Sequence, residues 1–461
     1  MINPKIFKDY DIRAEMGTEL DEDGVRRIAR AFAALFQPKV VAVGHDMRLT
    51  GEMVGQAMME EFSAMGVDVL NLGLISTDAS YYAAGKLDTD YVVMITASHN
   101  PPRYNGMKIT KRGGQSLDGE SAIYPLRDKA LSDEVIEPSP QAAQHPGKIT
   151  VVENVLAEFA QHALSLVDVS HIAPLKVLID AGNGMAGAIL PPVLEKMPIQ
   201  VEKMYFELDG NFPNHLANPL IEEGQKQARA KLQAGGFDLG VLFDGDGDRM
   251  FLMDEQGRFI PGTITTAMVA KQILQQYPGE TILYNAICGR VVPEVIAQNG
   301  GQGQRTRVGH SIIKKVMRET NAVFAGEHSG HYFFRDFFGA DSGLVAMLYA
   351  LEYISSQHKP VSAIVAEFDI YPQSGEMNFA VEDKDGMMAA LEEQFKGQTK
   401  SIDHLDGVSI WFDTWWANLR PSNTQPVIRL NVEADTPEIL DERVKELVAF
   451  IESRGGKQSF E

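Results

Sequence analysis

The segment LGVLFDGDGD, residues 239–248, joins a short apolar run to three aspartates at alternate positions. An apolar run that passes directly into a glycine-containing polar turn is typical of a buried strand in a parallel sheet. The same pattern occurs in YVVMITASHN, residues 91–100, and in AVFAGEHSGH, residues 322–331. Open α/β sheets bind ligands at the carboxyl ends of their strands, so these three loops are predicted to carry the chemistry.

Helical periodicity alternates with such strands outward from these segments, which indicates βαβ units. Further strands are predicted at 40–43, 67–72, 177–180 and 281–283. Helices are expected at 52–64 and 79–86, and a third should bury Val25, Ile28, Phe32 and Leu35 on one face.

The C-terminal part differs. Strands are predicted at 407–412 and 427–433, and a last helix should begin after Thr436, its N-cap. The expected fold is therefore three consecutive α/β domains with mainly parallel mixed sheets, followed by a C-terminal α+β domain. The predicted domain boundaries are 1–150, 151–256, 257–366 and 367–461.

Composition limits the classes of function. The 461 residues include 42 Lys plus Arg and 63 Asp plus Glu, a net charge of −21. Such an acidic chain is a poor general ligand for nucleic acid or an anionic membrane, and an anionic substrate would need a local cationic cluster. The single cysteine, Cys288, excludes an internal disulfide. With neither a signal peptide nor a membrane span evident, we expect a soluble cytoplasmic protein.

Asp244, Asp246 and Asp248 would repel one another unless they converge on a hard cation. A solvated acidic turn is the plain alternative. A calcium EF-hand would use the same aspartates with Glu255, but Arg249 occupies the position that requires glycine. In a phosphatase, Asp244 would be the nucleophile. A metal site without its own nucleophile fits best.

Ser98 follows the strand at 91–95 and by itself would be an ordinary turn or cap residue. Beside a divalent cation, however, a serine hydroxyl can carry a phosphoryl group, because the metal offsets the phosphate charge. His99 would then be an orienting neighbour.

Two other loops suit a phosphorylated sugar. Arg420, Ser422, Asn423 and Thr424 combine a guanidinium with hydroxyls and an amide, and Arg429 should lie beside them on the next strand. A plain proline-bracketed turn is the alternative. Glu327 and Ser329 can bind sugar hydroxyls, and His331 can move a proton, although a capped helix N-terminus would also explain them.

Together these loops resemble the α-D-phosphohexomutase family, and most closely its phosphomannomutase/phosphoglucomutase branch. The resemblance covers nearly the whole chain. It extends to the following segments: FKDYDIR at 7–13, GHDMR at 44–48, YNGMK at 104–108, DGNFPN at 209–214 and RVGHS at 307–311.

The resemblance implies four domains around a central cleft and the following roles. Ser98 would be the phosphoserine and would hold Mg²⁺ together with the three aspartates. The catalytic set would also include Lys108 and His331, for proton transfer, and Arg249. The substrate-binding set would be Tyr10, Arg13, Arg290, His310, Glu327, Ser329, Arg420, Ser422, Asn423, Thr424 and Arg429.

The implied reaction interconverts mannose 6-phosphate and mannose 1-phosphate through a hexose 1,6-bisphosphate, with glucose phosphates as further substrates. The alternatives are phosphoglucomutase as the main activity and a metal-dependent sugar-phosphate phosphatase. Small-molecule sugar phosphates would be the partners of a monomer or homodimer. Ile287, Arg307 and His328 depart from the family pattern, whereas Asn423 argues against the phosphoglucosamine branch.

Overall fold

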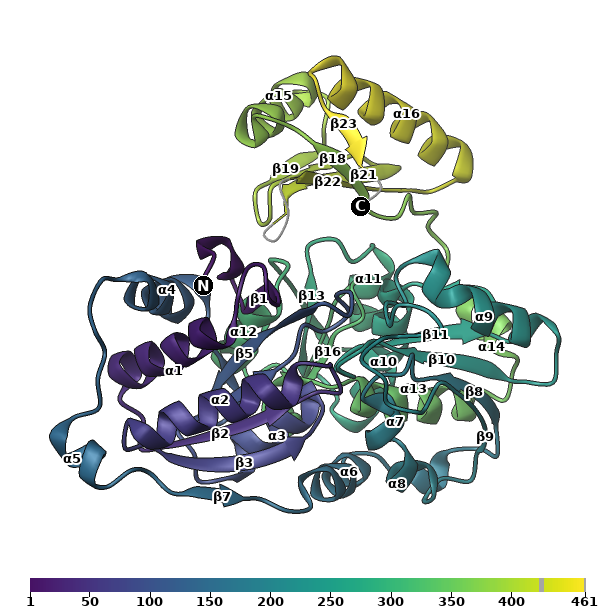
Figure 1. The fold of residues 1–461 in the computed structure, drawn as a ribbon. Helices are drawn as coiled ribbons and strands as arrows, with labels where there is room; N and C mark the ends of the chain where they lie inside the picture. Colours follow the sequence, from purple (N-terminus) through teal and green to yellow (C-terminus); the bar gives the residue numbers. More distant parts are fainter. Residues whose placement is uncertain (423–426, 460–461) are drawn as a thin grey trace.

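A computed structural model describes residues 1–422 and 427–459 of the chain. Four sheets follow one another along it (Figure 1), the first three mixed and the fourth antiparallel. We call the regions built on them the first to fourth domains. The predicted fold class is confirmed, while the predicted boundary positions stay predictions.

The sheet of the first domain has the strand order β1-β5-β4-β2-β3-β7, with β6 beside β5. Its central strands are parallel, and β5 runs antiparallel to both of its neighbours β1 and β4. The strands are β1 Ile12–Glu15, β2 Val40–His45, β3 Asp68–Leu74, β4 Tyr91–Ile95, β5 Tyr104–Lys111, β6 Gln115–Ser116 and β7 Ile149–Val151. The α-helices are α1 Glu22–Phe36, α2 Gly51–Ala64, α3 Thr77–Lys86, α4 Tyr124–Leu131 and α5 Pro140–Gln144.

The second sheet has the order β12-β11-β10-β8-β9, in which β10, β8 and β9 are parallel and β11 turns back beside β10. Its strands are β8 Lys176–Asp180, β9 Gln200–Met204, β10 Leu239–Phe243, β11 Met250–Asp254 and β12 Phe259–Ile260. The α-helices are α6 Val155–Ser165, α7 Ala186–Ile189, α8 Pro191–Leu194 and α9 Glu222–Gln233.

The third sheet has the order β14-β13-β15-β16-β17. As in the second sheet, three neighbouring strands are parallel (β14, β13 and β15), while β16 runs antiparallel to both β15 and β17. Its strands are β13 Thr281–Asn285, β14 Gln302–Thr306, β15 Phe324–Gly326, β16 Tyr332–Phe334 and β17 Ala340–Asp341. The α-helices are α10 Gly262–Gln276, α11 Val291–Gln298, α12 His310–Thr320, α13 Gly343–Gln357 and α14 Val361–Val365. The strand expected from the apolar run at the start of the segment 322–331 begins at Phe324, two residues into that segment.

The fourth sheet has the order β19-β20-β21-β22-β18-β23. Figure 1 shows α15 and α16 on its side away from the other domains. The strands are β18 Met377–Ala380, β19 Ser401–Asp403, β20 Val408–Trp411, β21 Trp415–Pro421, β22 Val427–Ala434 and β23 Lys457–Ser459, and the helices are α15 Lys384–Phe395 and α16 Pro437–Ser453. As predicted, Thr436 caps α16, accepting a hydrogen bond from the N–H of Ile439.

One helix prediction is wrong in detail. Leu35 is 38% exposed, while Phe36 packs against the core of the first domain. The apolar face of α1 continues from Phe32 with a four-residue step, because 3.6 residues per turn brings i and i+4 onto one face.

Apolar packing separates the fourth domain from the rest. One cluster of buried side chains runs from Ala42 in the first domain through the second domain to Phe368, whereas the fourth domain has its own core around Phe379, Leu430 and Ile451. Among the described residues, no helix has the length and apolar composition needed to cross a membrane.

Candidate active site

Ser98 and the acidic triplet Asp244, Asp246 and Asp248 meet although 146 residues separate Ser98 from Asp244. The serine loop, residues 96–103, joins β4 to β5, and the triplet lies between β10 and β11. Ser98 Oγ donates a hydrogen bond to Asp244 Oδ2 at 3.0 Å, and both residues are buried. The backbones also touch, since a Cβ atom on Gly245 would lie 2.5 Å from the carbonyl oxygen of Ser98.

The triplet has the properties of a cation site. One carboxylate oxygen from each aspartate lies within 4.8 Å of the others. Asp246 Oδ1 and Asp248 Oδ1 are buried, and neither accepts a hydrogen bond from any residue that the structure describes. Buried carboxylate oxygens normally have partners, so this donor set fits a hard divalent cation.

The EF-hand alternative fails on two observations. The triplet follows strand β10 rather than a helix, and Glu255, the expected twelfth loop position, accepts a hydrogen bond from the N–H of Ser362 at 3.0 Å. The carboxylate of Glu255 is therefore committed to α14 and not to the cation site.

Lys108 on β5 supplies the positive charge of the site. Its Nζ donates to Asp246 Oδ2 at 2.8 Å and to Asp248 Oδ2 at 2.6 Å. Burial alone would lower the pKa of Lys108, but the two carboxylates outweigh burial and hold that pKa well above its usual value. For Asp246, burial acts in the other direction and would raise the pKa, but the nearby Lys108 ammonium lowers it below its usual value. The ammonium and the Asp246 carboxylate are thus both charged.

Arg249 contacts the same carboxylate oxygen of Asp244 that accepts from Ser98. Its Nε donates to Asp244 Oδ2 at 2.8 Å, and its Nη2 contacts His99 Nδ1. Burial raises the pKa of Asp244 to about 7 despite Arg249, because Asp246 and Asp248 add negative charge nearby.

Glu327, Ser329 and His331 lie in the turn that joins the antiparallel strands β15 and β16, not at a helix N-terminus. Ser329 Oγ lies 3.1 Å from His331 Nδ1, and His331 Nε2 lies 3.8 Å from Asp248 Oδ1. Burial raises the pKa of Glu327 to about 7 and lowers the pKa of His331 to about 3. The turn thus brings a neutral imidazole to the edge of the triplet.

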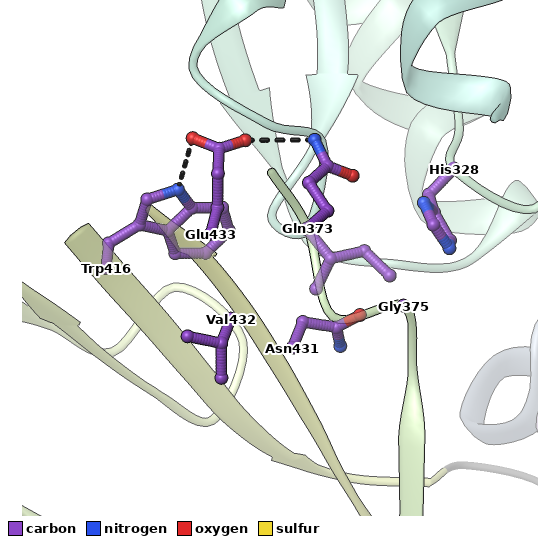
Figure 2. Close-up of a pocket in the computed structure, with 8 residues that line it drawn as sticks. His328, Gln373, Gly375, Trp416, Asn431, Val432 and Glu433 are labelled. Atoms are coloured by element: carbon purple, nitrogen blue, oxygen red, sulfur yellow. Dashed lines mark hydrogen bonds between the residues drawn. The ribbon is translucent and has the colours of Figure 1, made fainter. Parts of the chain in front are cut away.

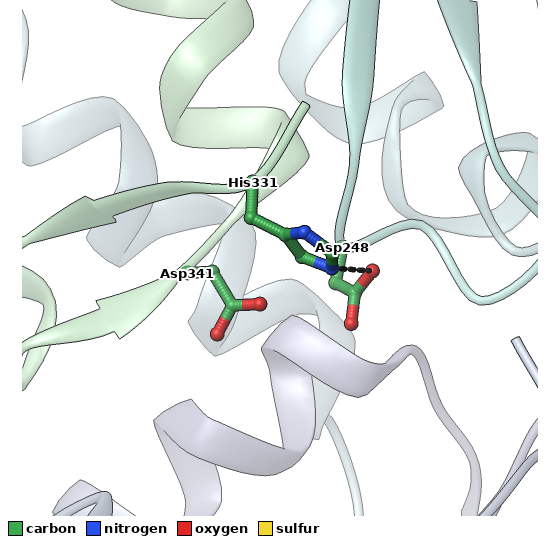
Figure 3. Close-up of side chains that lie close together, drawn as sticks. All are labelled: Asp248, His331 and Asp341. Carbon is green, nitrogen blue, oxygen red and sulfur yellow. Dashed lines mark ion pairs between the residues drawn. The ribbon is translucent and has the colours of Figure 1, made fainter. Parts of the chain in front are cut away.

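A buried ion pair lies behind His331, and sequence reasoning missed it. Lys314 Nζ is 2.6 Å from Asp341 Oδ1, and both side chains are fully buried. Figure 3 shows Asp341 beside His331 and Asp248, with ligand atoms of the three within 4.8 Å of one another. In the sequence, Asp341-Ser342-Gly343 has the pattern of a helix N-cap. Nothing in that pattern indicates that Asp341 pairs with Lys314.

Arg420 and Arg429 occupy opposite positions on β21 and β22, so the predicted cationic pair exists. Glu376 bridges them, accepting from Arg420 Nη2 at 2.7 Å and lying 3.0 Å from Arg429 Nη1. Burial would raise the pKa of Glu376, but the two guanidiniums lower it. Sequence reasoning missed Glu376, because no local motif marks it. Ser422 is buried beside them, whereas Asn423 and Thr424 lie outside the described residues.

Three other predicted residues lie around the serine loop and the third domain. Arg13 on β1 donates from Nη1 to Asn100 Oδ1 of the serine loop at 2.7 Å. The rings of Tyr10 and His310 meet edge to face, with centroids 5.1 Å apart. This contact joins the first and third domains beside the site.

Arg290 is engaged differently. Its Nε donates to Glu433 Oε1 at 2.7 Å, and its Nη1 lies 2.8 Å from Asp435. Glu433 also accepts from Trp416 Nε1 and Gln373 Nε2, both at 2.9 Å (Figure 2). Arg290 therefore ties the third domain to the fourth, and its predicted contact with substrate stays a prediction.

Comparison with known families covers the chain in four pieces, each a domain of the phosphoglucomutase/phosphomannomutase family. Alpha/beta/alpha domain I matches residues 4–130, and domains II and III match 157–257 and 261–371. The C-terminal domain matches residues 376–450.

Individual relatives agree. A protein of Xanthomonas campestris pv. campestris named "Phosphohexose mutases" is 36% identical over 96% of this chain and 98% of its own length. A "Phosphomannomutase" of Salmonella montevideo is 34% identical over 98% of this chain and its full length. The crystal structure of a phosphoglucomutase/phosphomannomutase family protein from Burkholderia thailandensis superposes with a TM-score of 0.89 at 30% identity, covering both chains completely.

Proposed function

The chain belongs to the phosphoglucomutase/phosphomannomutase family of isomerases, and on that premise we propose that it interconverts mannose 6-phosphate and mannose 1-phosphate, with the corresponding glucose phosphates as further substrates. The observation that carries the proposal is the contact between Ser98 Oγ and the acidic triplet. The 34% identity to a protein named phosphomannomutase supports mannose as the main sugar.

In the proposed reaction, Ser98 carries the phosphoryl group. The bond between phosphorus and Ser98 Oγ breaks as a bond forms to the free hydroxyl of the hexose monophosphate. The sugar hydroxyl loses its proton and Ser98 Oγ gains one. The resulting hexose 1,6-bisphosphate turns around in the site and returns its other phosphoryl group to Ser98.

Mg²⁺ is the proposed cation, because oxygen donors from three carboxylates and a phosphoserine suit it. Asp244, Asp246, Asp248 and Ser98 would hold it. When bound, it offsets the negative charge of the phosphoryl group and polarises it for transfer. Arg249, beside Ser98 and Asp244, adds fixed positive charge at the same place.

Lys108 and His331 are the proposed proton-transfer groups. Lys108 carries a proton, and its ammonium is paired with Asp246 and Asp248. A cation that takes over these carboxylates would lower the pKa of Lys108 and so let it donate to the substrate. His331 is neutral, because burial lowers its pKa to about 3, so its ring is unprotonated. The negative charge of a bound sugar phosphate would raise that pKa and let the ring accept a proton. Which group serves which half of the reaction depends on the orientation of the sugar.

The remaining predicted residues would hold the substrate. Glu327 and Ser329 would bind sugar hydroxyls, and the cationic pair Arg420 and Arg429 would bind the phosphate that is not transferred. The other proposed contacts are Tyr10, Arg13, Arg290, His310, Ser422, Asn423 and Thr424.

Intact mass spectrometry tests the proposal. Incubation of the protein with mannose or glucose 1,6-bisphosphate should add one phosphoryl group that maps to Ser98. Ser98→Ala should accept none and should lose mutase turnover by at least about 10³-fold while remaining folded. Side-by-side kinetics on mannose and glucose phosphates then decide the preferred sugar. Near-normal turnover by Ser98→Ala would contradict the assignment, and release of inorganic phosphate without any bisphosphate requirement would instead favour the phosphatase.

A further inference from the structure

Arg48 is a buried guanidinium at the base of the serine loop that the proposed mechanism does not use. It follows β2 and lies beside the loop that leaves the neighbouring strand β4. The residue is 3% exposed. Burying a cation is costly unless its donors are satisfied, so the groups around Arg48 show what it does.

The guanidinium donates to four backbone carbonyls, three in the serine loop and one at the start of β5. Nη1 bonds to the oxygens of Pro101 and Tyr104, both at 2.9 Å. Nη2 bonds to the oxygens of Ser98 at 2.7 Å and Asn100 at 2.6 Å. One side chain therefore holds the whole turn from Ser98 to the start of β5.

Two contacts from different domains hold Arg48 itself. Asp46 Oδ1 accepts from the N–H of Arg48 at 3.0 Å, and Asp46 Oδ2 lies 3.5 Å from Arg48 Nε. From the second domain, the ring of Phe212 lies against the guanidinium, with Cζ 5.4 Å from the ring centroid. Phe212 also reaches the triplet loop, since its Cζ would lie 3.6 Å from a Cβ on Gly245.

The serine needs this support. Ser98 has φ of +51°, the left-handed region that costs a non-glycine residue about 1 kcal/mol or more. Such a conformation persists only when its surroundings impose it, and the bonds of Arg48 to the carbonyls of Ser98 and Asn100 do so.

We propose that Arg48 is a positioning residue that holds the serine loop in the conformation in which Ser98 Oγ faces Asp244. The inference rests on the proposed function, because it gives Arg48 a part in phosphoryl transfer at Ser98. A lysine cannot replace Arg48, since a single ammonium nitrogen has three donors and no planar fork that reaches four separate carbonyls.

The test compares Arg48→Lys with the wild type. A displacement of about 1 Å can cost about 10²-fold in rate, so we expect kcat to fall about 100-fold. KM should change less than about threefold, because the proposed sugar and phosphate contacts lie in other loops. The rate at which glucose 1,6-bisphosphate phosphorylates Ser98, measured by intact mass spectrometry, should fall by about the same factor as kcat.

Arg335→Lys is the matched control. Arg335 also has an acidic partner, Glu280, and an aromatic one, Tyr277, but it lies in the third domain away from the serine loop. Its kcat should stay within about twofold of wild type.

Phe212→Leu keeps Arg48 but removes the ring that covers it, and should lower kcat about tenfold at unchanged KM.

The outcomes separate the inference from the proposed function. A wild type without mutase turnover defeats the function itself. If the wild type is active, the inference is overturned when folded Arg48→Lys keeps kcat and the rate of Ser98 phosphorylation within twofold of wild type. It is also overturned when the loss of kcat in Arg48→Lys is fully explained by a smaller fraction of folded protein. If Arg48→Lys fails to fold, Phe212→Leu decides, and wild-type kcat in that variant overturns the inference.

Discussion

Lys108 is the residue on which the charge balance of the site depends. Its ammonium offsets two carboxylates that are otherwise buried side by side. Removing one partner of a buried ion pair costs about 3–5 kcal/mol, because the remaining charge loses its compensation. A cation bound to the triplet can take over that compensation, so Lys108 and the cation act on the same charges.

We expect Lys108→Met to destabilise the metal-free protein by about 3 kcal/mol. Added Mg²⁺ should raise Tm more in the variant than in the wild type, because a ligand that binds only the folded state stabilises it, and the variant site is more negative. Thermal unfolding with and without Mg²⁺ measures this. Lys231→Met, which removes an exposed partner of Glu202, should change Tm little and should not alter the Mg²⁺ shift. An equal Mg²⁺ shift in Lys108→Met and wild type would contradict the expectation.

At the scale of elements, the site depends on the contact between two loops that leave different sheets. At Gly245 the two backbones lie so close that an added Cβ would be 2.5 Å from the carbonyl oxygen of Ser98, so one of the backbones would have to shift. Glycine is required here by space and not by its φ angle.

Gly245→Ala should therefore push the two loops apart and lower kcat about 100-fold, since misplacement of about 1 Å has an effect of that size. Steady-state kinetics and Ser98 phosphorylation measure the loss. Gly55→Ala is the control, because a Cβ there would meet its nearest neighbour only at 3.9 Å. That substitution lies within α2 and should leave kcat unchanged while stabilising the protein slightly. Full activity in Gly245→Ala would show that the loops tolerate separation.

On the scale of the whole molecule, the fourth domain is held by polar contacts, whereas the first three share an apolar core. Glu433 on β22 accepts a hydrogen bond from Arg290 of the third domain and so contributes to these contacts. Figure 2 shows its two other bonds, from Trp416 of the neighbouring strand β21 and from Gln373 in the segment before β18. A domain with its own core can move as a body when a few such contacts break.

Glu433→Gln should loosen this attachment, because the neutral side-chain amide of glutamine cannot form an ion pair with Arg290. Hydrogen exchange in the segment 286–292 should become about tenfold faster, equivalent to about 1.4 kcal/mol. Exchange in the core of the fourth domain, at β21, should stay unchanged. The surface variant Glu202→Gln serves as control. Unchanged exchange at 286–292 would mean that other contacts hold the domain.

The sequence by itself determined the helices and strands and the loops in which the candidate site lies. The strands at 91–95 and 239–243 lie where their apolar runs predict them, and Thr436 caps the last helix. These features depend on residues a few positions apart, so a local pattern contains all the information needed. The triplet and Ser98 were likewise recognisable, because their residue types fit one chemistry. The roles of the site residues and the domain boundaries stay predictions.

Only the tertiary structure decided which charges meet. Arg48 reaches carbonyls about 50 residues away. Glu376 pairs with both Arg420 and Arg429, and Arg290 pairs with Glu433, which is 143 residues distant. These charged side chains meet because folding brings segments that are far apart in the sequence to the same place. A short-range periodicity in the sequence contains no information about such distant contacts. Sequence patterns therefore identify the candidate reacting groups, whereas the residues that hold them in place emerge only from the folded arrangement.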